Sequence, residues 1–277
     1  MRTISSLLRT LPISRGKRRL ARFLLARPPA RENVQLTTRN GLHVVVPSLI
    51  EPISISLLAT GSYEPQMLDV FREYLPVGGT FVDVGANIGL FAGEMSHQVG
   101  PMGHVIAIEA SNRIFSHLLE MIALNHLENV RAILCAAHDR DEEAVSFWDA
   151  PVSSYGMGSL SKQFGASPVN VPARTLDGIL AECQSPRVHV MKVDVEGFEA
   201  AVFRGASKLL AGPEKPVIAF EFNDWAEERA GFPVGEAQRI LLDFGYRLRS
   251  LENWRPDTPT LSCPMIRGSD NLVATPS

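Results

Sequence analysis

The stretch Thr80-Phe81-Val82-Asp83-Val84-Gly85-Ala86-Asn87-Ile88-Gly89-Leu90 decides the fold of this chain. Residues 80–84 predict a buried strand, with Asp83 close to its end. Gly85 and Gly89 bracket a tight turn, and an apolar helix begins directly after it. A strand that runs through glycines into the N-terminus of a helix is typical of a nucleotide-type binding loop, in which the backbone comes close to the ligand.

The residues of this loop favour S-adenosylmethionine over other nucleotide-type ligands. A dinucleotide loop has glycines at its first, third and sixth positions, whereas the third position here is Asn87 and the next glycine is Gly89. No Gly-Lys-Ser/Thr follows, which excludes a P-loop. The Asp83 carboxylate would repel a phosphate but suits the ammonium group of S-adenosylmethionine, whose own carboxylate suits a helix N-terminus. The alternative interpretation is a glycine-rich turn with a capping aspartate.

A second acidic residue supports the same ligand. Residues 104–108 predict another buried strand, and Glu109 ends it. An acidic residue about 20 positions after the first glycine, at the end of the second strand, holds the ribose hydroxyls of an adenosine group. Taken alone, Glu109 would read as a helix N-terminal carboxylate before Ser111, but together with Asp83 and the glycines it indicates a ribose site.

Composition limits the remaining possibilities. A chain of 277 residues suits one large α/β domain, or one domain with an extension. No run of about 18 apolar residues predicts a membrane span. The three cysteines Cys135, Cys183 and Cys263 are far apart and odd in number, so they predict neither a disulfide framework nor a zinc site. A reducing compartment such as the cytoplasm is the simplest location for them.

Charge is distributed unevenly along the chain. The whole chain carries −3 and residues 1–30 carry +8 with no acidic residue, so the remainder carries −11. Such an acidic body does not predict a nucleic-acid binder. Residues 1–30 fit a basic helix at the surface of an anionic membrane, a transit peptide or a solvated arm. Pro12 and Gly16 interrupt any long helix there, which favours the solvated arm.

The rest of the chain predicts a β-hairpin and then a regular α/β alternation. Asn40-Gly41 between two apolar runs is the usual turn of a tight hairpin, and a helix is expected at about 66–74. Strands are expected at 80–84, 104–108, 130–134, 188–195 and 217–222, with helices at about 88–98, 112–125, 199–210 and 235–244. This alternation predicts a central, mostly parallel sheet with helices on both faces. We therefore divide the chain into a basic arm (1–30), a hairpin and helix extension (31–76) and an α/β domain (77–277).

The most unusual segment is a charged strand end. In an extended chain Lys192, Asp194 and Glu196 share one face, and Glu221 ends the next strand in a similar way. Methyl transfer to oxygen needs an aligned acceptor and a base or metal that takes its proton. The four residues are the catalytic candidates, with Lys192 acting as a base only if burial lowers its pKa, and His138 is a further candidate. The three carboxylates suit Mg²⁺, although their spacing does not establish a metal site. A self-compensating lysine–carboxylate cluster is the structural alternative.

These motifs together resemble the FkbM-type methyltransferases over about residues 60–250. The resemblance rests on Gly61-Ser62-Tyr63-Glu64, residues 82–89, Glu109, Asn125, Thr175-Leu176-Asp177 and Met191-Lys192-Val193-Asp194-Val195-Glu196-Gly197-Phe198-Glu199. It implies a class I (Rossmann-like) methyltransferase fold with S-adenosylmethionine as methyl donor. The donor-binding set that it implies is Glu64, Asp83, Gly85, Asn87, Gly89, Glu109 and Ala110. Ala110 is a departure, since the family commonly has proline there.

The resemblance further implies a hydroxyl acceptor on a sugar, a lipid or a natural product. The first hypothesis is therefore an S-adenosylmethionine-dependent O-methyltransferase whose loop at 151–168 is a lid or acceptor-binding loop. Methylation of nitrogen is an alternative, but the Pro-Pro-aromatic signature of adenine-N6 enzymes is absent, because Pro28-Pro29 precedes Ala30. A non-catalytic donor-binding scaffold is a second alternative. The missing glycine spacing argues most strongly against a dehydrogenase.

Overall fold

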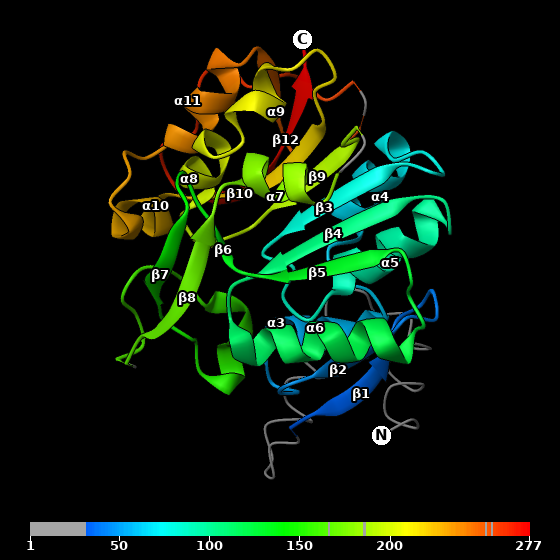
Figure 1. Ribbon diagram of the computed structural model, residues 1–277. Coiled ribbons are helices and arrows are strands. Elements are labelled where there is room, and N and C mark those ends of the chain that lie inside the picture. Colours follow the sequence, from blue (N-terminus) through cyan, green and yellow to red (C-terminus); the bar gives the residue numbers. More distant parts are fainter. Residues whose placement is uncertain (1–31, 166, 185–186, 253, 256) are drawn as a thin grey trace.

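The computed structural model describes residues 32–277 apart from residues 166, 185–186, 253 and 256, so the basic arm lies outside the described residues. Its centre is a seven-stranded sheet in the order β11-β12-β10-β9-β3-β4-β5 (Figure 1). Strand β12 is antiparallel to both neighbours, and the other neighbouring strands are parallel. The strands are β3 (Thr80–Val84), β4 (His104–Glu109), β5 (Val130–Leu134), β9 (Val190–Val193), β10 (Val217–Asn223), β11 (Tyr246–Ser250) and β12 (Ser269–Pro276).

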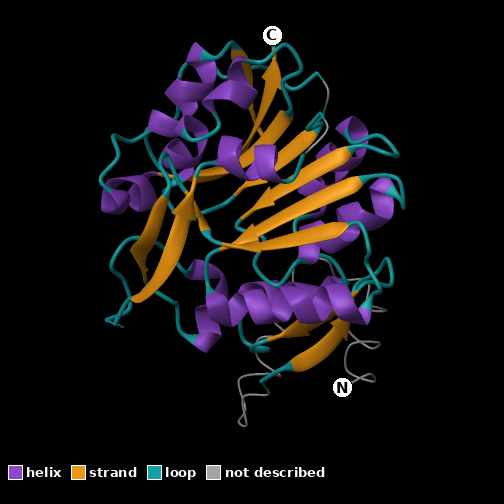
Figure 2. Ribbon diagram, in the orientation of Figure 1, coloured by secondary structure: helices purple, strands orange, loops and turns teal. Residues whose placement is uncertain are grey.

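Helices cover both faces of this sheet (Figure 2). Alternate residues of β3 enter two separate cores, since Phe81 packs into one and Val82 into the other. Full burial of a side chain such as Phe81 contributes about 1.5–3 kcal/mol. The first core includes α4 (Pro65–Tyr74), α5 (Leu90–Val99) and α6 (Asn112–Leu124), and the second includes α7 (Leu176–Glu182), α8 (Glu199–Arg204), α9 (Ser207–Ala211) and α11 (Glu236–Asp243). The structure thus confirms the expected class I architecture.

The hairpin expected before the sheet is present. Strands β1 (Val34–Thr37) and β2 (His43–Val46) pair antiparallel, and Gly41 takes a positive φ of 91° in the turn between them. Asn125, at the end of α6, fixes the hairpin, because its side chain accepts from the backbone N–H of His43 and donates to the carbonyl of His43. The hairpin therefore shares the first core with α5 and α6.

A helix that the sequence did not predict follows the hairpin. Residues Pro52–Thr60 form α3, which the buried carboxylate of Glu51 caps by accepting from the backbone N–H groups of Ile53 and Ser54. Helix α10 (Asp224–Ala230), after β10, was also not expected. The single helix expected at 199–210 is two short helices, α8 and α9, separated near Gly205. A Cβ on Gly205 would overlap the carbonyl oxygen of His138, so the chain needs glycine at this break.

A small second sheet lies beyond the edge strand β5. It contains β6 (Ala136–Ala137), β8 (Val169–Arg174) and β7 (Glu142–Phe147) in that order. The loop expected at 151–168 begins with a short 3-10 segment, η1 (Val152–Met157). Within the described part of the chain, every helix is too short or too polar to cross a membrane.

Candidate active site

A cavity of about 260 Å³ opens at the carboxyl ends of β3, β4, β9 and β10. In a mostly parallel sheet this is where ligands bind, beside the point at which the strand order reverses between β3 and β9. Of the residues expected to form the site, nine line the cavity: Glu64, Gly85, Asn87, Glu109, Ala110, Lys192, Asp194, Glu196 and Glu221. Asp83 and Gly89 are not among the residues that line it.

Position 85 requires glycine because of a tertiary contact that the sequence does not reveal. Gly85 has φ +77°, and a Cβ there would overlap the carbonyl oxygen of Asp194, so β3 and the chain after β9 approach closely. Asn87 also has a positive φ, of 52°, and its backbone N–H donates to the carboxylate of Glu109 at 2.8 Å. Gly89 has a different task, because a Cβ there would overlap Met121 of α6. It allows α5 to pack against α6.

Glu109 forms the floor of the cavity with apolar residues around it. Its two carboxylate oxygens accept from the backbone N–H groups of Asn87 and Ser111, each at 2.8 Å. Burial raises the pKa of Glu109 to about 7, against the effect of these hydrogen bonds. The nearby cavity wall is apolar and includes Ala110 and Phe147. A carboxylate fixed beside an apolar wall fits a ribose next to a flat adenine base.

Asp83 is fully buried and faces a lysine of its own chain. Its Oδ1 lies 3.7 Å from Nζ of Lys192, which is itself 3 % exposed and lies 3.2 Å from Asp194. Burial lowers the pKa of Lys192, but Asp194 and Asp83 raise it by more, so the net change is upward. This is the opposite of what a lysine base requires, because Lys192 remains an ammonium group at neutral pH. Its ammonium also donates to the carbonyl of Gly85.

The other three catalytic candidates come together at one end of the cavity. Carboxylate oxygens of Asp194, Glu196 and Glu221 lie within 4.8 Å of one another. The chain turns sharply after β9, and Glu196 takes a positive φ of 55°. Buried Glu199 holds this turn, since its carboxylate accepts from the backbone N–H of Val195 at 2.9 Å. The shared face that an extended chain predicts for Lys192, Asp194 and Glu196 is therefore replaced by a turn that still brings all three to the cavity.

Burial and mutual repulsion favour the protonated forms of Glu221 and Glu196. Burial, together with repulsion from the neighbouring Asp194 and Glu196, raises the pKa of Glu221 to about 9. The pKa of Glu196 rises to about 7 for the same reasons, opposed by Arg229 and Lys192. A carboxyl group that titrates near neutral pH can take a proton from an acceptor. Three carboxylates this close also form a donor set that suits Mg²⁺.

Sequence reasoning missed several residues that line the cavity. Glu51 and Tyr63 close it from the side of α3, and Asn271 of β12 lies beside Glu64. Tyr155, which also lines the cavity, belongs to the loop at 151–168 that was expected to be a lid or acceptor-binding loop. Glu51 followed by Pro52 is a helix-start signal that could have revealed α3. The structure does not place His138 in the cavity wall: its Nδ1 lies 2.7 Å from Asp139.

The protein family described as "Methyltransferase FkbM domain" matches residues 83–248 of this chain. That range runs from Asp83 through the charged turn after β9 to β11, so it contains most of the cavity described above. The chain belongs to the FkbM methyltransferase family. "Methyltransferase sdnD" of Sordaria araneosa is 27% identical over 249 residues, which cover 76% of this chain and 93% of the fungal protein.

Two of the solved structures similar to this FkbM-family chain are named as methyltransferases. The FkbM protein of Methylobacillus flagellatus has 14% identity and a TM-score of 0.45, covering 80% of this chain, which spans about half (52%) of that one. A "SAM dependent methyltransferase" of Aquifex aeolicus has 16% identity and a TM-score of 0.42, covering 82% of this chain and 94% of its own. Part of the cavity of this family member, including Glu51, Glu64 and Asn271, comes from outside residues 83–248.

Proposed function

We propose that this FkbM-family methyltransferase transfers the methyl group of S-adenosylmethionine to a hydroxyl of a sugar, glycolipid or natural-product acceptor. The observation that carries the proposal is the composition of one cavity. It joins a glycine loop and a ribose-type carboxylate, Glu109, at one end to a group of protonatable carboxylates at the other. The first end suits the donor, and the second suits a hydroxyl that must lose its proton.

The donor fits the residues present. Gly85 has no side chain, so the donor can approach the backbone of the loop closely. The carboxylates of the cavity suit a donor that carries an ammonium and a sulfonium group. The proposed donor-binding residues are those of the loop with Glu64, Glu109 and Ala110. Asp83 remains in this set, and because it is buried against Lys192, we propose that it acts on the donor by fixing the position of Lys192.

For proton removal we propose Glu196, whose pKa of about 7 leaves it partly ionised at neutral pH, beside the protonated Glu221. Asp194 holds the ammonium group of Lys192 in place. Lys192 remains charged and supplies positive charge beside the reacting groups. Bound Mg²⁺ at Asp194, Glu196 and Glu221 would polarise the acceptor hydroxyl, and it is a separate element of the proposal. If turnover is unchanged after treatment with EDTA, the proposal no longer includes a metal ion.

The experiment that tests the function is a methylation assay with labelled donor on a panel of hydroxylated acceptors. Transfer of label to a hydroxyl of a sugar or natural product supports the proposal, and transfer to an amine only would replace it by N-methylation. Donor binding without transfer to any acceptor would favour a non-catalytic scaffold. We propose a cytoplasmic location from the three separated cysteines. Contact of residues 1–30 with a membrane remains a prediction about residues outside the described part.

A further inference from the structure

A buried carboxylate from outside the family's matched range lies in the cavity wall. Glu51 is 4% exposed, precedes α3 and lines the cavity. Its Oε2 caps the helix, accepting from the backbone N–H groups of Ile53 at 2.6 Å and Ser54 at 3.4 Å. The cap fixes the carboxylate in place through Oε2, and the second oxygen, Oε1, accepts from neither of these backbone N–H groups. The hydroxyl of Tyr155 is a further hydrogen-bond partner of this carboxylate. No lysine or arginine of the described residues lies within 4.0 Å of this carboxylate.

Oε1 of Glu51 lies on the donor side of the cavity. A Cβ placed on Gly156 would lie 3.4 Å from Glu51 Oε1 and 3.5 Å from Nδ2 of Asn87. Asn87 belongs to the glycine loop, and its backbone N–H holds Glu109. The space in front of Gly156 is therefore bordered by Glu51 and by the loop that faces the ribose end.

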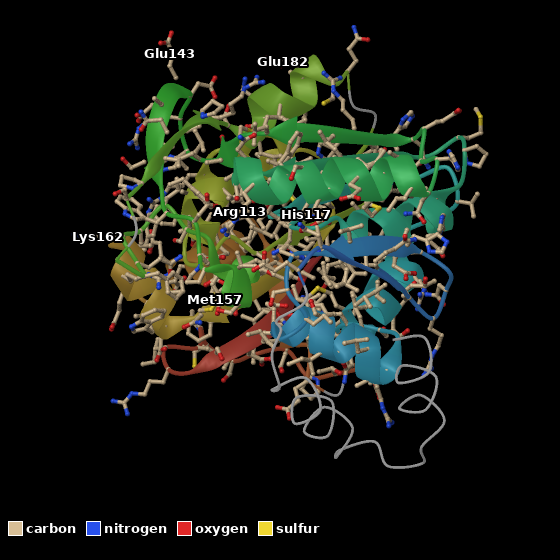
Figure 3. The ribbon with its side chains drawn as sticks, turned by 90° about the horizontal axis from the view of Figure 1, so that it is seen from below. Arg113, His117, Glu143, Met157, Lys162 and Glu182 are labelled. Atoms are coloured by element: carbon tan, nitrogen blue, oxygen red, sulfur yellow. The ribbon has the colours of Figure 1, made fainter. Side chains whose placement is uncertain are left out.

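The η1 segment covers this space and is attached at both sides. The hydroxyl of buried Tyr155 lies 3.2 Å from Oγ of Ser54 on α3. On the other side, Arg113 of α6 donates to the carbonyl of Ala150. Figure 3 shows Met157, at the end of η1, below the helix that carries Arg113 and His117. Glu51 and η1 thus form one wall of the cavity.

We propose that Glu51 is a donor-binding residue and that its Oε1 accepts a hydrogen bond from the methyl donor in the space in front of Gly156. This inference rests on the proposed function, because it takes S-adenosylmethionine as the ligand. Loss of a hydrogen bond to a charged group should weaken donor binding about tenfold or more.

The test is a calorimetric titration of the full chain and of matched variants with S-adenosylmethionine. Glu51→Gln keeps the shape of the side chain and an oxygen for the cap. Its control is Glu227→Gln, because Glu227 is equally buried and accepts from the backbone N–H groups of Gly235 and Ala237 without lining the cavity. We expect Glu51→Gln to raise the Kd about tenfold or more and Glu227→Gln to change it less than about twofold.

A second variant leaves Glu51 intact and fills the space instead. Gly156→Ala places a methyl group at ordinary contact distance from Glu51 and Asn87, and Gly212→Ala is the control because its Cβ meets only backbone of α9 outside the cavity. We expect Gly156→Ala to weaken donor binding several-fold while melting within a few degrees of Gly212→Ala. If Glu51→Gln does not fold, this pair alone decides.

When both variants fold, the proposal requires both affinity changes. An unchanged Kd in Glu51→Gln or in Gly156→Ala would overturn it, and so would equal weakening in Glu51→Gln and Glu227→Gln. Failure of the wild-type chain to bind the donor would instead refute the proposed function. The two failures are therefore distinguishable in one set of titrations.

Discussion

Substitution of Gly85 by alanine should damage both stability and donor binding. The added Cβ would overlap the carbonyl oxygen of Asp194 and lie 3.0 Å from its carbonyl carbon, so the backbone of one of two adjacent strand ends must move. Overpacking of this kind costs roughly 1–3 kcal/mol. The φ of +77° adds about 1 kcal/mol for a residue with a Cβ. We therefore expect a total destabilisation of roughly 2–4 kcal/mol.

Gly78→Ala is the matched control for this prediction. Gly78 has nearly the same φ, +78°, but a Cβ there meets nothing within 4 Å. It should cost only about 1 kcal/mol for the positive φ. In a chain of this size 1 kcal/mol lowers the Tm by about 2–4 °C, so Gly78→Ala should lose about that much and Gly85→Ala roughly 4–16 °C.

Thermal unfolding and donor titration of the two variants measure these effects. Gly78→Ala should keep the donor affinity of the wild type, because the residue lies away from the cavity. Gly85→Ala should lose donor binding, because the loop that faces the donor must shift. Equal losses of Tm in the two variants, or unchanged donor affinity in Gly85→Ala, would contradict the close approach of β3 and the turn after β9.

Three further substitutions test the charged groups. Asp194→Asn should leave donor binding largely intact but cut turnover on the true acceptor, and full turnover would remove Asp194 from the catalytic set. Asp83→Ala should abolish donor binding as measured by calorimetry, because Lys192 loses one of the two carboxylates that fix its position. Unchanged donor affinity would contradict the assignment of Asp83 to the donor-binding set. Glu221→Gln should stabilise the protein without donor at high pH. The carboxyl group of Glu221 has a pKa of about 9 in the folded protein and about 4.5 in the unfolded chain. Its contribution to stability is therefore present below about pH 4.5 and is lost as the pH rises toward 9. Its Tm relative to wild type, measured with EDTA at pH 6 and pH 9, should therefore be higher at pH 9, and a constant difference would contradict the raised pKa.

Local signals in the sequence were enough to predict the parallel strands of the central sheet and the donor loop. The turn after β3 has positive φ at Gly85 and Gly89, and glycine is the residue that adopts such φ values most readily. These glycines therefore mark the turn in the sequence. Glu109 follows from the spacing between one strand end and the next. The hairpin was predicted from Asn40-Gly41 because turn chemistry is also local.

The part of the cavity wall that α3 contributes depends on tertiary packing and was not predicted, whereas η1 lies within the loop at 151–168 that was expected to be a lid or acceptor-binding loop. Residues 48–61 carry no clear amphipathic pattern, since α3 is buried along most of its length, and so Glu51 could not be placed in the cavity. Helix α10 did leave signals: Asn223 caps it and Gly231 ends it with φ +82°. The pairing of Asp83 with Lys192 requires the register of β3 on β9, which the sequence does not state.

The most direct test of the central claim is calorimetric titration of the full chain with S-adenosylmethionine and, separately, with NAD. We expect saturable binding of the methyl donor at one site and no binding of the dinucleotide. Binding of NAD, or no binding of S-adenosylmethionine to the folded protein, would contradict the claim that this cavity is a methyl-donor site.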